Sequence, residues 1–134
     1  MNHLSTRRSR RAAGRARRAV IRTRAAANRL AASCRRHPRS IATHLLAAGV
    51  DRDAATGCAS GLRAVAKRLN IEPVEVARTR RTVQGGRARR VHVVYHYTRT
   101  QVARIASAYR PKKSSYRAAI DRLALSLQGG LAVA

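Results

Sequence analysis

Acidic residues are scarce in this chain, and their scarcity sets its charge. Only 5 of the 134 residues are Asp or Glu, against 30 Lys and Arg, so the formal net charge is +25. The first carboxylate is Asp51, and the 40 residues at the start contain 13 arginines. This segment therefore carries +13, and the remainder carries +12 from 17 basic and 5 acidic residues. A field of one sign this dense repels itself in solution, and it predicts a polyanionic partner.

Aromatic residues, cysteines and long apolar runs are also few. The chain has no Phe or Trp and only 4 Tyr, which leaves Tyr95 and Tyr97 as the candidates for stacking on unpaired bases. Cys34 and Cys58 are too few for a disulfide framework, so we expect reduced thiols and a cytoplasmic location. No apolar run approaches the length of a membrane span, and no hydrophobic segment typical of a secretory signal follows the N-terminal charges.

Groups that could perform catalysis or hold a metal are sparse. Three of the 5 carboxylates lie at or near predicted helix starts, and Glu72 and Glu75 flank Pro73, so no cluster of the kind that metal-dependent nucleases use is evident. His92 and His96 lie on a predicted strand, where four residues span roughly 13 Å, too far for one ion. We therefore predict no enzyme activity, no cofactor and no metal site.

The N-terminal segment has the composition of a helix. Residues 6–35 lack Pro and are rich in the helix formers Ala and Arg. Small apolar residues recur along it at spacings of three and four, namely Ala13, Ala16, Val20, Thr23, Ala27, Leu30 and Cys34. Because these side chains are small and arginines crowd the other faces, we predict a helix that is marginal when free and forms against phosphates. Its candidate contacts are Arg7, Arg8, Arg10, Arg11, Arg15, Arg17, Arg18, Arg22, Arg24, Asn28, Arg29, Arg35 and Arg36.

Two further helices are predicted after His37-Pro38. Ser40 is a good N-cap for a helix over 41–48, and Asp51 begins a second helix that runs to about residue 69. Gly57 and Gly61, one turn apart, would either let the first of these helices approach closely or break the second into two. The buried stripe of the second helix is predicted to be Ala55, Cys58, Leu62, Val65, Ala66 and Leu69.

A β-hairpin is predicted next, because Val and Tyr alternate in the strands on either side of Gly85-Gly86. A two-residue turn at these glycines places Val76 opposite Tyr95 and Val74 opposite Tyr97, at the base of the hairpin. Six arginines crowd its tip: Arg78, Arg80, Arg81, Arg87, Arg89 and Arg90. An apolar base and an arginine-rich tip favour a hairpin that projects from the body.

Two helices are predicted to complete the chain. Thr98 and Gln101 have the spacing of a capping box and open a helix that ends before Pro111. A last helix covers about residues 115–128. We therefore predict an α+β fold that is mostly helical. Its three parts are an Arg-rich arm (1–39), a nucleic-acid-binding body (40–110), and a C-terminal helix and tail (111–134).

The order helix, helix, basic hairpin, helix over residues 40–110 resembles a winged-helix DNA-binding domain. The resemblance implies that residues 58–69 are a recognition helix in the major groove and that residues 76–97 are the wing. It also implies a turn near Thr56-Gly57, whereas the apolar periodicity predicts one unbroken helix. Arg and Lys can read guanine edges, Asn can read adenine, and an Arg-rich wing suits a narrow minor groove. The candidate base contacts on the helix are Thr56, Ser60, Arg63, Lys67 and Asn70.

The arm carries a second, shorter resemblance. Asn28, Ala31, Ala32 and Arg36, in the run "NRLAASCRR", have the spacing found in the basic region of leucine-zipper transcription factors. Arg35 departs from that pattern, and no zipper follows. The resemblance implies only a helix that can lie in a groove.

These features together predict a double-stranded DNA-binding protein, regulatory or architectural, from a bacterium or phage and associated with the nucleoid. The alternative is an RNA-binding structural protein of ribosomal type, because such proteins thread long basic helices through folded RNA. A third possibility is a packaging protein that binds nucleic acid without sequence preference. All three interpretations require a nucleic-acid partner and no membrane, and they leave the oligomeric state open.

Overall fold

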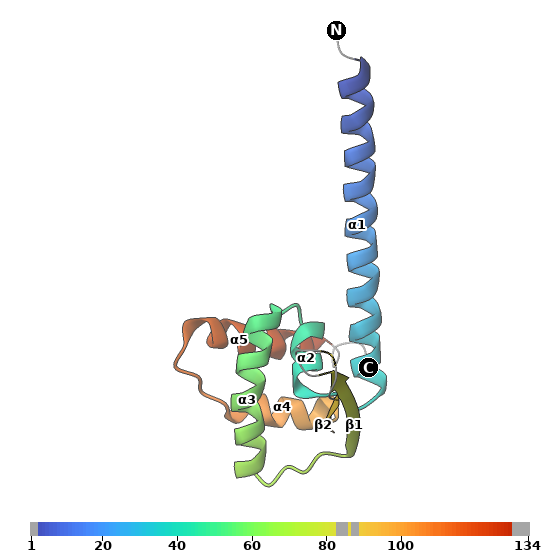
Figure 1. Ribbon diagram of the computed structural model, residues 1–134. Coiled ribbons are helices and arrows are strands. Elements are labelled where there is room, and N and C mark those ends of the chain that lie inside the picture. The colour runs from blue at the N-terminus through green and yellow to red at the C-terminus, as the bar shows by residue number, and fades with distance from the viewer. Residues whose placement is uncertain (1–2, 83–85, 87–88, 130–134) are drawn as a thin grey trace.

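The computed structural model describes residues 3–82, 86 and 89–129, except for the side chains of residues 3–5, 81–82, 89 and 129. Its elements, in chain order, are α1 (His3–Arg36), α2 (Ile41–Ala47), α3 (Arg52–Arg68), β1 (Glu75–Thr82), β2 (Arg89–His96), α4 (Arg99–Ala108) and α5 (Ser114–Gly129) (Figure 1). The predicted class is confirmed: the described chain is mostly helical, with one antiparallel hairpin between α3 and α4.

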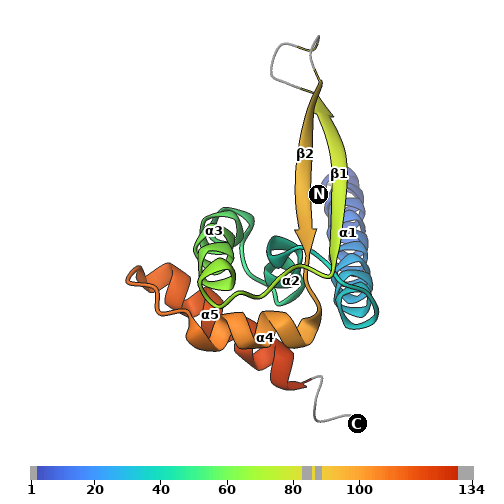
Figure 2. The same ribbon diagram turned by 90° about the horizontal axis from the view of Figure 1, so that it is seen from below.

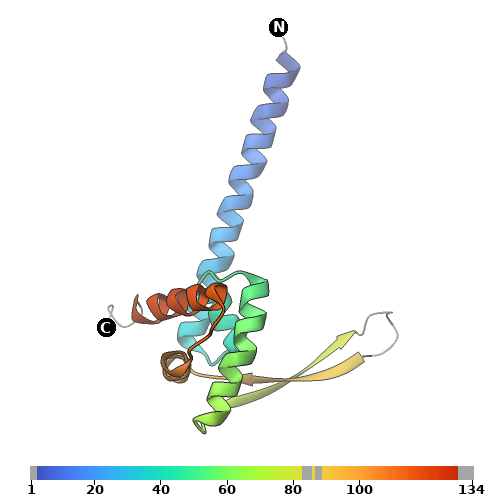
Figure 3. The same cartoon turned by 90° about the vertical axis from the view of Figure 1, so that its left-hand side faces the viewer.

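Helix α1 runs unbroken for 34 residues and extends away from the other elements (Figures 1 and 3). At 1.5 Å per residue it is about 50 Å long. Nearly all side chains from Thr6 to Arg29 are exposed, whereas Cys34 is buried and its Sγ lies 3.9 Å from the carbonyl oxygen of Thr43. Packing therefore holds only the last turns of α1, and the rest depends on the helix propensity of Ala and Arg.

The core lies where α2, α3, α4 and α5 meet. Ile41, Leu45, Leu62, Ile105 and Leu123 come from all four helices, and each is at most 2% exposed. The last turns of α1 pack against α2 from outside this cluster. The body is thus a small helical cluster that holds its own apolar interior, with the arm and the hairpin attached to it.

Two of the predicted helix caps form, but Asp51 makes no side-chain capping hydrogen bond at the start of α3. The Ser40 hydroxyl accepts from the Thr43 amide at the start of α2, and Thr98 and Gln101 form the reciprocal capping box of α4. In the predicted stripe of α3, one residue is wrong. Leu69 is 40% exposed, because α3 ends at Arg68 and Leu69 is its C-cap residue.

Gly57 and Gly61 have a role that differs from both predicted alternatives. Helix α3 is continuous through them, and α2 is not the element that covers them. The rings of Tyr116 and Tyr109 lie directly over Gly57 and Gly61 respectively, so close that a Cβ at either glycine would collide with the ring. The glycines therefore admit two tyrosines from the C-terminal half of the chain.

The hairpin has the predicted register, with Val76 opposite Tyr95. The regular pairing ends one pair short of the predicted Val74–Tyr97 pair: the Val74 amide donates to the His96 carbonyl oxygen at 3.0 Å, and Tyr97 forms a bridge with Arg39 through backbone hydrogen bonds of 2.9 and 3.1 Å. This bridge ties the base of the hairpin to the segment that follows α1. From there the two strands project away from the helices, and in Figure 2 they lie between α1 and α3.

Candidate nucleic-acid interface

The body contains a helix–turn–helix arrangement, and its turn lies at residues 48–51. Gly49 adopts the left-handed conformation (φ +88°), which Gly tolerates without strain, and the buried Val50 anchors the turn in the core. A guanidinium nitrogen of Arg122 donates to the Gly49 carbonyl oxygen at 2.8 Å. The implied turn near Thr56-Gly57 is therefore wrong, and the second helix of the unit is the whole of α3.

Helix α3 presents a polar stripe to the outside. Side chains three or four residues apart lie on one face of a helix, and those of Thr56, Ser60, Arg63 and Lys67 are all exposed. The same stripe begins one turn earlier, at the exposed Arg52, which the sequence reasoning missed. The sequence could have identified Arg52, because it stands four residues before Thr56 and therefore on the same face of the helix.

Asn70, the fifth predicted residue of this face, lies beyond the end of α3. It adopts a left-handed conformation (φ 54°), which Asn tolerates better than most residues. The Ile71 amide donates back to the Ala66 carbonyl oxygen, as in a Schellman-type helix end. The exposed Asn70 amide group is thus held at the C-terminal end of the stripe by the way the helix terminates.

The hairpin combines basic and apolar side chains on one face. Residues alternate between the two faces of a strand, so the cross-strand pairs Val76–Tyr95, Arg78–Val93 and Arg80–Val91 share a face. Valine and tyrosine side chains on it are 45–57% exposed, which corrects the expectation that apolar pairs are confined to the base. Arg90 is exposed on the opposite face. Arg87 lies outside the described residues, as do the side chains of Arg81 and Arg89.

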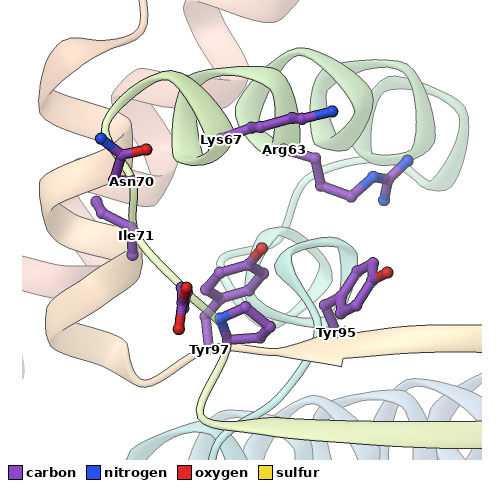
Figure 4. Close-up of a pocket in the computed structure, with 8 residues that line it drawn as sticks. Arg63, Lys67, Asn70, Ile71, Tyr95 and Tyr97 are labelled. Atoms are coloured by element: carbon purple, nitrogen blue, oxygen red, sulfur yellow. The ribbon is translucent and has the colours of Figure 1, made fainter.

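A cavity separates the α3 stripe from β2 (Figure 4). It has a volume of about 490 Å³, and Arg63 and Lys67 line it from α3 while Tyr95 and Tyr97 line it from the hairpin side. Asn70 lies at one end, and Glu72 also lines the cavity. A second hollow of about 560 Å³ shares Arg63, Tyr95 and Tyr97 and continues toward Thr56. Helix and hairpin thus form the two walls of one groove.

Basic groups on these surfaces remain without acidic partners. Within the described residues, His96 Nδ1 lies 3.7 Å from a Glu75 carboxylate oxygen, and no Arg or Lys forms an ion pair. Some body arginines instead hold backbone carbonyls, as Arg99 does at the C-terminal end of α5. The arginines of α1, of the α3 stripe and of the hairpin therefore keep their charge available for an external anion.

The arginines of the arm are arranged in rows. Arg8, Arg15, Arg22, Arg29 and Arg36 recur every seven residues, or about two helical turns, so they follow one side of α1. A second row runs through positions 10, 17 and 24, and every arginine of α1 is exposed. The small apolar stripe lies on the opposite side and meets the body only at its C-terminal end.

Buried polar groups support the base of the hairpin. Burial lowers the pKa of His44, whose Nε2–H donates to the Tyr97 carbonyl oxygen at 3.1 Å in the neutral ring. Burial also raises the pKa of Tyr97, although the nearby Arg63 guanidinium opposes this effect. Tyr97, one of the two predicted stacking residues, is only 5% exposed. Its role is in the core, and Tyr95 alone of the pair offers a free ring face.

Other kinds of site find little support in the geometry. Among the residues that the structure describes, no three His, Cys, Asp or Glu side chains gather closely enough to hold a metal ion. No helix in the described ranges is both long and apolar enough to cross a membrane. Comparisons with protein families, with characterised proteins and with solved structures return no match.

Proposed function

We propose that this protein binds double-stranded DNA, in a regulatory or architectural role, through a winged-helix-like body and an Arg-rich arm. One observation carries the proposal. The exposed stripe of α3 follows a glycine turn and faces a projecting basic hairpin, so a recognition helix and a wing border the same groove. The major groove of B-form DNA admits an α-helix, and Arg52, at the start of α3, can donate to guanine there.

The three basic surfaces have different parts in this proposal. The N-terminal half of α3, with Arg52, Thr56 and Ser60, is the part that enters the groove, because recognition helices contact bases through their first turns. The hairpin arginines and the arm contact phosphates, which adds affinity without sequence preference. Each neutralised phosphate releases a counterion, so a body and an arm that together contact about ten phosphates give a log–log salt slope near −9.

An RNA-binding structural role is the second candidate, and α1 is the observation that favours it. Its exposed arginines follow a helix about 50 Å long, of which only the last turns contact the body. A helix of this kind can also follow the crowded phosphates of folded RNA. The α3 stripe opposite a wing is better matched to B-form grooves, because the deep major groove of A-form RNA excludes side chains.

Selection of bound sequences from random duplex DNA, with structured RNA as the competitor at physiological salt, tests the proposal. A defined duplex motif supports a regulator, and a flat profile at high affinity supports an architectural protein. Preferential capture of the RNA would refute the duplex assignment in favour of the second candidate. A salt slope shallower than about −3 would show that most of the charge never meets nucleic acid.

Two sets of variants then distinguish contacts with bases from contacts with phosphates. Arg52→Ala and Ser60→Ala should each relax the preference at particular base pairs, and a good bidentate contact from Arg52 is worth about 1–3 kcal/mol of discrimination. Arg80→Ala and Arg90→Ala, on the hairpin, should weaken binding to selected and random duplex alike. If the helix variants lose affinity equally on both duplexes, α3 does not read sequence.

A further inference from the structure

The cavity between α3 and β2 has a composition that a duplex groove alone does not account for. Tyr95 presents a ring that is 45% exposed, in a chain without Phe or Trp. The other tyrosines are committed elsewhere: Tyr97 is in the core, and Tyr109 and Tyr116 cover the glycines of α3. A single free aromatic ring at a basic cavity is a stacking platform for a base.

The two ends of the cavity differ in charge. Arg63 and Lys67 extend from α3 along one wall (Figure 4), where they can hold a phosphate. Glu72 and Asn70 line the other part, and an amide nitrogen of Gln101 fixes the backbone there by donating to the Glu72 carbonyl oxygen at 2.8 Å. The cavity thus offers cations, an apolar ring and a mixed donor–acceptor end.

This combination discriminates between classes of ligand. The Glu72 carboxylate would repel a bare phosphate or another small anion, and the cations would be left unpaired by an apolar molecule. A nucleotide satisfies all three parts, because it has a phosphate, a flat apolar face and a polar base edge. The volume of about 490 Å³ lies within the usual range of small-molecule sites.

We propose that this cavity binds one unstacked nucleotide, with its base on the Tyr95 ring, its phosphate at Arg63 and Lys67, and its base edge toward Asn70 and Glu72. The proposal deepens the nucleic-acid-binding function and rests on it. The carboxylate favours a base that carries an amino group, because Glu accepts from the exocyclic amine of cytosine. The nucleotide can come from a single-stranded segment, from a bulge, or from a duplex that releases one base.

The test measures the binding of the full chain to three DNAs by fluorescence anisotropy: a paired duplex, the same duplex with one bulged nucleotide, and a single strand. A 2-aminopurine at the bulge, and at the same place in the other two, reports stacking by its fluorescence. Tyr95→Ala should weaken binding to bulged and single-stranded DNA by roughly 5- to 150-fold. Tyr95→Phe keeps the ring, and Val76→Ala trims the neighbour directly opposite, so both should change affinity less than about twofold.

The paired duplex distinguishes the source of the nucleotide. If Tyr95→Ala weakens paired-duplex binding and the wild-type protein changes the 2-aminopurine signal there, the duplex releases the base. If Tyr95→Ala binds all three DNAs as tightly as the wild type, or loses affinity on all of them with no 2-aminopurine response, the proposal is wrong. If the wild-type protein does not bind the paired duplex but binds the bulged duplex and the single strand through Tyr95, the proposed duplex function is wrong and the nucleotide site is supported.

Glu72→Gln tests the orientation of the base within the site. With cytosine, adenine or thymine at the bulge, the wild-type protein should prefer the two bases that carry an amino group over thymine by several-fold. The variant should lose this preference while its affinity for the paired duplex changes little, because Glu72 lies away from the α3 stripe. An unchanged preference would overturn the assignment of Glu72 to the base edge.

Discussion

The arm and the body carry nearly equal net charge, +13 in residues 1–40 and +12 in the remainder, but hold it by different means. In the body, the α3 stripe is fixed by a core in which Leu62 and Ile105 are fully buried, and the hairpin is tied to the body at its base by the Arg39–Tyr97 bridge. In the arm, no core supports the arginines before Leu30. The charges of the α3 stripe are therefore preorganised, whereas arm charges take up their rows only as far as the isolated helix is stable.

This difference implies a division of labour in binding. Preorganised groups lose little conformational entropy when they contact a ligand, so they can support selective contacts. The arm must order its outer turns as it binds, and its contacts with phosphates do not depend on sequence. Altering one region at a time, while affinity and stability are measured, tests this division.

Removal of residues 1–29 should have the largest effect. The truncation keeps Cys34 and Arg39, which contact the body, and deletes ten of the thirteen arginines of residues 1–40. Affinity for nucleic acid should fall by orders of magnitude, and the log–log salt slope should become shallower by about 4.5 if the deleted segment contacts about five phosphates. Thermal unfolding of the body, followed by tyrosine fluorescence, should be nearly unchanged.

A variant of full length separates charge from length in this experiment. Arg8→Gln, Arg15→Gln and Arg22→Gln together keep the helix propensity and remove three of the five charges of one row. The slope should become shallower by about 2.7, since each phosphate that is no longer neutralised accounts for about 0.9. If the triple variant binds as the wild type does while the truncated protein loses affinity, the length of the arm accounts for the loss and its charge does not.

Glycine-to-alanine changes should have opposite signs in the two regions. At Gly61 a Cβ would collide with the Tyr109 ring, so Gly61→Ala should destabilise the body by about 1–3 kcal/mol through overpacking. At Gly14 the nearest atom is the flexible Arg18 guanidinium at 3.6 Å, and Gly14→Ala should stabilise the arm helix by about 0.5–1 kcal/mol.

Circular dichroism of the full chain resolves the two effects, because an arm without a core of its own should melt separately from the body. Gly14→Ala should raise helicity at low ionic strength without moving the main transition, and Gly61→Ala should lower the main transition temperature. Equal shifts of one common transition in both variants would show that arm and body unfold as one unit.

The parts of this structure that follow from neighbouring residues could be predicted, and the parts that depend on distant contacts could not. The capping box of Thr98 and the pairing of Val76 with Tyr95 are local patterns, and both were predicted correctly. The bridge from Arg39 to Tyr97 joins residues 58 positions apart, and the Arg122 contact with Gly49 joins residues 73 apart. Neither leaves a periodic signal in the sequence.

The candidate site shows the same division. The exposed face of α3 could be derived from helical spacing, but the resemblance placed the turn too late, near Thr56-Gly57, and so hid Arg52. The cavity that joins Arg63, Tyr95 and Glu72 could not be predicted, because it depends on the direction in which the hairpin leaves the body. Tyr97 was predicted as a possible stacking residue because its burial at the base of the strand depends on tertiary contacts. The sequence pattern does not show these contacts.

The last predicted effect is a pH dependence that belongs to the body alone. Burial lowers the pKa of His44 below its ordinary value of 6.5, so between that value and the lower folded-state pKa the unfolded chain binds more protons than the native one. The free energy of unfolding should therefore fall as the pH drops below about 6.5, by at most about 1.4 kcal/mol per pH unit for one proton.

The arm provides the internal control, because residues 6–36 contain no His, Asp or Glu, and its helicity should not change over the same range. Urea unfolding of the body at several pH values between 7 and 5 measures the effect. His44→Gln replaces the ring with a neutral donor that can still reach toward the Tyr97 carbonyl oxygen, and it should flatten the dependence even if it lowers stability overall. A slope that survives in this variant would assign the dependence to other groups, and His44 would then be a packing residue only.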